Sequence, residues 1–238
     1  MNKYRSSAEL KALAKEKLDG KYSTVIVAVA LIHLIQFLLA STATPVSVFG
    51  VIVATLSSAV VSAVLGIFQT GLALLFLNIA CDRPYSSGDI YYGFRCSPGR
   101  SLAVSVVIVL VNMIPLLPYQ IFSMLYMHTR NPIWLIFTMV TLAIGLVIYV
   151  PLSLALSQSY FLLLDFPDYS AKQILQTSCR IMKGHMGRLF YIEASFLPLQ
   201  LLAALSFGIG LLWVMPYMHM TYALFFLDIM NPQKKASE

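Results

Sequence analysis

One carboxylate, Glu193, lies inside a long stretch of sequence that otherwise carries no acidic or basic side chain until Asp228. An ionisable group in an apolar helix is costly to bury, so it is generally paired or functional. Two interpretations follow. Glu193 forms a structural ion pair with Arg188, or with Arg95 or Arg100, or it binds a ligand or a proton.

Two histidines and several amides lie in similar apolar stretches, and the strongest candidates are His33, Gln36, Gln69, Gln158 and His219. His33 and Gln36 are three residues apart and share one face of a helix. Such groups either hydrogen-bond neighbouring helices, which contributes about 0.6 to 2 kcal/mol each, or line a polar cavity. With Glu193, they form the candidate intramembrane polar site.

Signatures of enzymes, cofactors and metals are missing from the sequence. It contains no Gly-x-Ser-x-Gly, His-Glu-x-x-His or phosphate-binding loop. The three cysteines, Cys81, Cys96 and Cys179, have no metal-ligand spacing. We therefore expect no catalytic residues, no cofactor and no metal.

The elements that position these residues follow from composition and charge. Hydrophobic residues make up 59% of the chain and charged residues 11%, against roughly 25% charged in soluble domains, and the mean hydropathy is +0.80. Charged residues are absent from four gaps: Lys21 to Asp82, Arg100 to Arg130, Arg130 to Asp165, and Glu193 to Asp228. Because a transmembrane helix needs about 20 apolar residues, the pattern predicts an all-α integral membrane protein.

The gaps predict six transmembrane helices within residues 23–230, arranged as three helical hairpins. The expected spans are about 23–40, 49–80, 102–127, 133–164, 189–206 and 211–227. The last two follow because residues 189–230 are too long for one crossing, and Gly208 and Gly210 mark the reversal. Residues 231–238 are expected to form a cytoplasmic tail.

Short amphipathic helices are predicted in the polar segments 1–22, 82–100 and 165–187. In the first, Ser6 and Glu9 have the spacing of a capping box. Such helices either lie on an anionic leaflet or are solvated. On the leaflet, the candidate lipid contacts are Lys11, Lys15, Lys172, Arg180 and Lys183.

The distribution of basic residues predicts the orientation. With six spans, fifteen of the sixteen lysines and arginines fall on one side and only Arg130 on the other. Basic residues concentrate in cytoplasmic loops, so both termini are expected in the cytoplasm. The net charge of +6 follows from this bias and needs no nucleic acid partner.

A weak internal repeat supports three hairpins of one orientation. Each even-numbered span ends in an apolar run, an aspartate and a nearby proline: Asp82 and Pro84, Asp165 and Pro167, Asp228 and Pro232. The aspartates are expected to cap short cytoplasmic turns or helices. The alternative is that aspartate and proline merely punctuate helix ends.

The last third of the chain resembles a bacterial membrane-protein family catalogued as domain of unknown function nine hundred seventy-five. The specific part is the run Gly208-Ile209-Gly210-Leu211-Leu212-Trp213, which continues to Pro216-Tyr217. Weaker similarity lies in Met182-Lys183-Gly184-His185, Arg188-Leu189-Phe190, Thr221-Tyr222-Ala223 and the start from Arg5 to Lys11. The resemblance covers essentially the whole chain and implies a multi-pass protein, with no site residues to carry over.

Three functional hypotheses remain open. The first is a non-enzymatic plasma-membrane protein, transport-associated or part of envelope stress or immunity, that binds a lipid or an amphiphilic peptide between its hairpins. The second is a transporter or channel with its own polar pathway. The third is a membrane enzyme, which requires two convergent titratable groups such as Glu193 and a histidine. The lipid bilayer, with its anionic cytoplasmic leaflet, is the expected partner.

Overall fold

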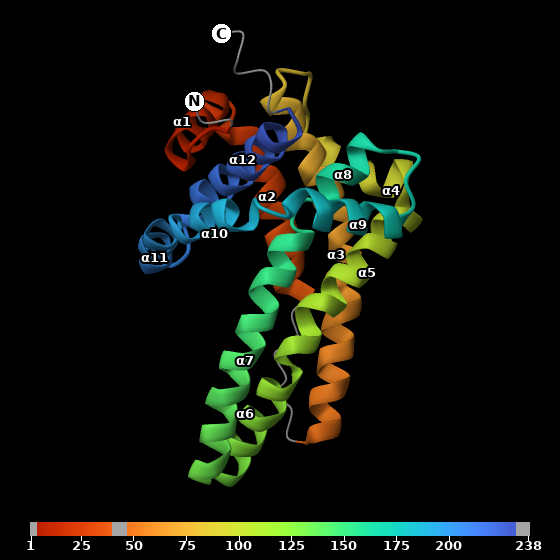
Figure 1. The fold of residues 1–238 in the computed structure, drawn as a ribbon. Coiled ribbons are helices and arrows are strands. Elements are labelled where there is room, and N and C mark those ends of the chain that lie inside the picture. The colour runs from red at the N-terminus through yellow and green to blue at the C-terminus, as the bar shows by residue number, and fades with distance from the viewer. Residues whose placement is uncertain (1–3, 40–46, 232–238) are drawn as a thin grey trace.

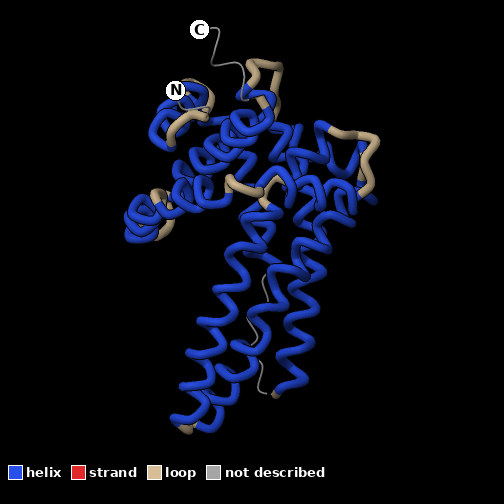
Figure 2. Tube along the Cα trace, viewed as in Figure 1, coloured by secondary structure: helices blue, strands red, loops and turns tan. Residues whose placement is uncertain are grey.

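A computed structural model describes residues 4–39 and 47–231, and every regular element in these ranges is a helix (Figures 1 and 2). The predicted break at residues 41–45 and nearly all of the predicted tail lie outside the described residues. The helices are α1 Ser7–Leu18, α2 Tyr22–Leu39, α3 Val48–Ala80, η1 Ser87–Tyr91, α4 Tyr92–Cys96, α5 Pro98–Met113, η2 Ile114–Leu116, α6 Leu117–Thr129, α7 Pro132–Leu156, α8 Ser159–Asp165, α9 Ala171–Met182, α10 Met186–Ala194, α11 Leu197–Leu205 and α12 Leu211–Met230.

Four helical stretches of the described chain are long and apolar enough to cross a bilayer: Phe49–Ala80, Pro98–Thr129, Pro132–Asp165 and Met186–Leu205. They coincide with predicted spans two to five. A fifth candidate combines α1 and α2, which meet at 103°. Most outward side chains on the long helices are apolar, as with Val147, which is 75% exposed. The chain is therefore an all-α protein with several apolar spans, as a multi-pass membrane protein requires.

The long helices α3, α6 and α7 run side by side away from one end of the molecule, which carries most of the short helices (Figure 1). We call that end the charged end, because α1, α4 and α9, which carry basic residues, lie there. The third span is interrupted by η2 at Pro115, and Pro118 lies in the first turn of α6. Gly145 on α7 fits against this break, because a Cβ there would lie 2.7 Å from the Pro115 carbonyl oxygen.

Two glycines let α3 approach its neighbours closely. A Cβ at Gly71 would overlap the backbone carbonyl of Ile90 in η1, and one at Gly66 would overlap the Ser105 side chain of α5. At Gly71 the two backbones therefore meet directly, as is usual where membrane helices pack on small residues. The two contacts fix which sides of α3 pack against η1 and α5.

The C-terminal helices α10, α11 and α12 run across the charged end rather than alongside the three long helices (Figure 1). The predicted fifth span is broken between α10 and α11, and α12, the predicted sixth span, is not among the four long apolar stretches. Ten of the twenty residues of α12 are buried, and Met220, Ala223 and Phe225 are fully enclosed. It packs against α1, α2 and α3.

The predicted amphipathic helices α1 and α9 both place their apolar faces on protein. In α1, Leu10, Ala14 and Leu18 are fully buried, and the helix packs on α12. In α9, Ile174 and Met182 are fully buried against neighbouring helices. The capping box of Ser6 and Glu9 is present. These apolar faces are thus occupied, which neither the leaflet nor the solvated interpretation anticipated.

Candidate functional site

A cavity of about 180 Å³ lies between α3, α10, α12 and the junction of α7 with α8. It brings together four of the six predicted polar residues: Gln69, Gln158, Glu193 and His219. The remaining lining residues are Leu72, Ala73, Phe76, Ser157, Tyr160, Phe161, Leu189 and Tyr222. We call this space the polar cavity. Its residues are distant in sequence, so only the packing of four segments assembles it.

Gln158 reaches the polar cavity because the fourth span is interrupted there. Helix α7 ends at Leu156, and Gln158 is the N-cap of α8, with only 1% of its surface exposed. Its Nε2 donates to the Ser157 hydroxyl at 2.9 Å, and that hydroxyl donates to the Leu154 carbonyl at 2.8 Å. Since the hydroxyl proton is already used, the hydroxyl accepts from Gln158, which fixes the amide orientation. Gln158 Oε1 is left buried without a hydrogen-bond partner.

Glu193 lines the polar cavity from α10, on the same helical face as Leu189 one turn earlier. Its carboxylate has no hydrogen bond or ion pair with any residue that the structure describes. The predicted pairing with Arg188 does not form. Arg188 lies on another face of α10 and binds Asp228 at 2.7 Å. Arg100 instead donates to the Leu163 carbonyl at 3.1 Å.

Aromatic rings form another part of the lining of the polar cavity, which we call the aromatic wall. His219 of α12 stacks on Phe76 of α3 with 5.5 Å between ring centroids, and meets Tyr222 edge-on at 6.4 Å. Phe161 stacks on Phe226 behind the wall at 5.2 Å. These contacts hold the rings in place without closing the space between them.

The electrostatic character of the polar cavity is set by Glu193. It is the only Lys, Arg, Asp or Glu among the described lining residues. Within the described chain, no group of three His, Cys, Asp or Glu could hold a metal ion. The cavity therefore offers one carboxylate, one unpartnered amide oxygen and aromatic faces to whatever enters it.

His33 and Gln36 lie outside the polar cavity. The buried stripe of α2 is formed by Val25, Val29 and Ile32, whereas both polar residues are exposed. His33 Nδ1 lies 2.8 Å from the Val29 carbonyl oxygen, one turn earlier in its own helix. The predicted set thus divides into four residues that converge and two that do not.

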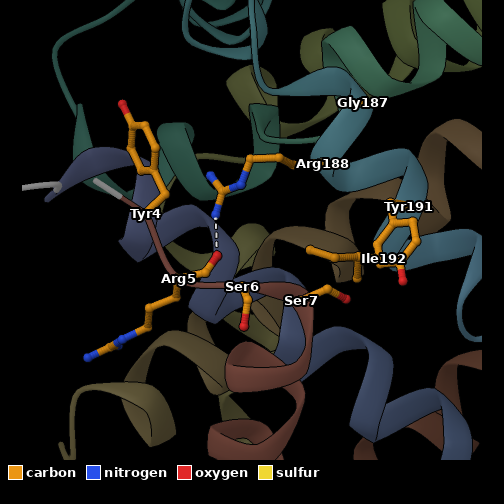
Figure 3. A pocket seen from close by; sticks show the side chains of 8 residues that line it. All are labelled: Tyr4, Arg5, Ser6, Ser7, Gly187, Arg188, Tyr191 and Ile192. Carbon is orange, nitrogen blue, oxygen red and sulfur yellow. Dashed lines mark hydrogen bonds between the residues drawn. The ribbon is translucent and has the colours of Figure 1, made fainter. Parts of the chain in front are cut away.

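A second, larger cleft of about 470 Å³ lies between the start of α1 and α10 (Figure 3). Arg188 reaches across it to donate to the Arg5 carbonyl at 2.8 Å, while the Arg5 side chain points away. The Arg5 N–H group in turn lies 3.2 Å from both carboxylate oxygens of Asp228. The Arg188 guanidinium also lies 4.8 Å from the Tyr4 ring and 5.3 Å from the Phe225 ring. We call this arrangement the N-terminal clamp.

The N-terminal clamp was not predicted from the sequence, although Asp228 stands out there as a member of the repeat. The aspartates were expected to cap helices, but Asp228 binds Arg188 and Arg5, and Asp82 pairs with Lys17 and, at 3.9 Å, with Lys21. The Lys17 hydrogen bond lowers the pKa of Asp82. Two of the repeated aspartates therefore fasten the two ends of the N-terminal helix.

The predicted lipid contacts behave differently in the two amphipathic helices. Lys11 donates to the Ser195 carbonyl at 3.1 Å and lies 4.0 Å from the Phe196 ring, and burial, followed by the charge of Lys15, lowers its pKa. Lys15 lies over the Tyr217 ring at 5.6 Å. By contrast, the polar face of α9 is exposed, including Lys172 and Arg180, as is Lys183 after it.

No curated protein and no solved structure matches the chain. A family model does, over residues 1–233, and its description is Protein of unknown function (DUF975). The match spans the N-terminal clamp, all the candidate spans and the polar cavity, and the chain therefore belongs to this family.

Proposed function

We propose that this protein is a non-enzymatic, multi-pass protein of the bacterial plasma membrane that binds the polar end of a lipid or an amphiphilic peptide in the polar cavity. Its role would be transport-associated, or in envelope stress or immunity. The observation that carries the proposal is the convergence of Gln69, Gln158, Glu193 and His219 on one space, with Glu193 unpaired. Polar groups that only joined helices would be expected to satisfy one another.

The size of the polar cavity favours a head group over a whole lipid. Liquid water occupies about 30 Å³ per molecule, so 180 Å³ holds only a few heavy atoms of a ligand. Leu72 and Leu189 line the same space and offer apolar contact to the adjoining part of the molecule. An amphiphile with a small polar end meets both requirements.

For the membrane placement, we propose that the charged end faces the cytoplasm, with both termini on that side of six spans. The support is the basic-residue bias together with the position of Arg130, which occupies the α6–α7 turn at the far end of the long helices (Figure 1). The exposed Lys172, Arg180 and Lys183 would then contact anionic head groups, each contributing about 1 kcal/mol. Two variants with one cysteine each test this placement in intact cells. The proposal predicts that an impermeant maleimide labels Arg130→Cys in a chain without other cysteines, and does not label a chain that keeps only Cys179. Equal labelling of both would contradict it.

Native mass spectrometry tests the binding proposal on protein extracted from its own membrane. Wild-type protein is expected to retain a small molecule or lipid that the double variant Glu193→Gln, Gln158→Leu loses. The matched control, Asp168→Asn, removes an exposed carboxylate outside the cavity and should retain the molecule. Equal retention by all three proteins, or by none, would reject the polar cavity as a binding site.

A transporter is the second candidate, because two titratable side chains, Glu193 and His219, line one cavity together with two amides. Intramembrane groups of this kind mark ion and substrate pathways. The exposed His33 and Gln36 do not extend the polar lining. Proteoliposomes distinguish the candidates: a transporter moves the retained molecule across the bilayer in a Glu193-dependent manner, whereas a binding protein only holds it.

A further inference from the structure

We propose that the polar cavity recognises a primary ammonium group, carried by a small amphiphilic amine, through Glu193 and Gln158. This inference rests on the proposed function and names the ligand class for the same site. It follows from three properties of the lining: its charge, its unused hydrogen-bonding capacity and its aromatic wall.

The charge of the polar cavity excludes anions as preferred ligands. Glu193 is the only charged member of the described lining, and no lysine or arginine offsets it. The nearest basic candidate in sequence, Arg188, is bound to Asp228. A carboxylate within an apolar span is most favourable with a cation beside it. The ligand that completes this site therefore carries a positive charge.

Hydrogen bonding narrows the cation to one with N–H donors. Gln158 Oε1 is buried and unpartnered, and the hydroxyl of Ser157 fixes it as an acceptor. Burying such an acceptor without a donor is unfavourable, because the water that it would otherwise bind is lost. A primary ammonium has three donors and no acceptor, so it can donate to a carboxylate and to an amide oxygen at the same time. A quaternary ammonium or an alcohol satisfies only part of this arrangement.

The aromatic wall adds a third requirement that an ammonium meets. Phe76, Phe161 and Tyr222 line the polar cavity, and a cation within about 6 Å of a ring face is attracted to it. His219 stacks on one face of the Phe76 ring, so a cation could meet only the other face of that ring. The remaining apolar lining, which includes Leu72 and Leu189, suits the first carbons of an alkyl chain.

Equilibrium dialysis of n-hexylamine against the protein in phosphatidylcholine nanodiscs tests the inference, with empty nanodiscs as background. Phosphatidylcholine is a suitable lipid because its head group has no N–H donor. Two analogues share the same chain: hexyltrimethylammonium keeps the charge without N–H donors, and 1-hexanol lacks the charge. We expect hexylamine to bind at least about 10-fold more tightly than hexanol, as loss of a charged hydrogen bond implies.

Two variants separate the roles of the two residues. Glu193→Gln keeps the side-chain shape, and it should weaken hexylamine binding by at least about 10-fold. Gln158→Leu should weaken hexylamine by about 5-fold while leaving hexyltrimethylammonium nearly unchanged. The control Asp168→Asn should bind like wild type, and matching unfolding transitions show that each variant is folded.

Three results would overturn the inference: no hexylamine bound above empty nanodiscs, equal binding of hexanol, or wild-type affinity in Glu193→Gln. These results are distinct from failure of the proposed function. If native mass spectrometry finds a molecule whose retention depends on the polar cavity while hexylamine does not bind, the ligand class is wrong and the binding site stands.

Discussion

Asp228 and Glu193 are two carboxylates in neighbouring helices of the same C-terminal unit, and their surroundings are opposite. Asp228, with 9% of its side chain exposed, accepts hydrogen bonds from the Arg188 guanidinium and the Arg5 N–H group. Glu193 faces the polar cavity with no partner among the described residues. The fold itself supplies the hydrogen-bond partners of Asp228, whereas Glu193 is free to bind a ligand that enters the polar cavity.

This difference separates a structural charge from a functional one. A buried carboxylate that the fold needs is paired, because losing its partner leaves an uncompensated charge. A carboxylate that the fold does not need adds little to stability and is retained for another reason. The N-terminal clamp and the polar cavity should therefore respond in opposite ways to loss of charge.

The largest expected effect is on the N-terminal clamp. Asp228→Asn leaves Arg188 without its counter-charge, so the free energy of unfolding should fall by about 3 kcal/mol. Denaturant unfolding in detergent measures this change, and proteolysis should cut the N-terminal segment faster. A double variant, Arg188→Met with Asp228→Leu, removes both charges and should recover part of the loss. Wild-type stability of the Asp228→Asn variant would contradict the structural role of the clamp.

The next effect concerns the helix that forms one wall of the polar cavity. Gly71→Ala places a methyl group against the Ile90 carbonyl, so η1 must move away from α3. We expect a loss of about 2 kcal/mol in the free energy of unfolding. Gly99→Ala is the matched control, because no atom lies within 4 Å of its Cβ position. Equal effects of the two substitutions would show that the close approach at Gly71 does not matter.

A smaller effect is expected at Glu193 itself. Glu193→Gln removes a charge that has no partner, so the free energy of unfolding should stay within about 1 kcal/mol of wild type or increase. The same denaturant titration provides the measurement. A loss comparable to that of Asp228→Asn would mean that Glu193 has a structural partner after all.

The smallest effect is expected at Asp82, which is exposed. Lys17 holds the pKa of Asp82 below its ordinary value. A lowered folded-state pKa contributes stability that is present above the unfolded pKa and is lost as pH falls through the folded value. Acidification should therefore release the α1–α2 corner at low pH, and Asp82→Asn should abolish this step. Site-specific fluorescence near Lys17 at low salt can follow it, and an identical acid transition in the variant would refute the assignment.

Sequence alone predicted the parts of this molecule that depend on local pattern. The charge-free gaps located the apolar spans, and Ser6 with Glu9 predicted the start of α1. Four of the six polar residues proposed for one site line the same cavity. These features follow from helical periodicity and from the cost of burying charge.

What sequence missed depends on tertiary packing. Arg188 is closer to Glu193 in sequence but lies on another face of the helix, so it pairs with Asp228. The apolar face of α1 is amphipathic in pattern, yet only the fold shows that α12 covers it. Likewise, residues 211–230 are apolar enough to suggest a span, but only the fold shows that they pack against α1, α2 and α3.

The most direct test of the account is the shift in thermal unfolding midpoint that hexylamine causes in wild type and in Glu193→Gln. A ligand that binds only the folded state raises this midpoint with increasing concentration. The account predicts a concentration-dependent rise for wild type and Asp228→Asn, and none for Glu193→Gln. A rise of the same size in Glu193→Gln would show that the unpaired carboxylate is not the binding group.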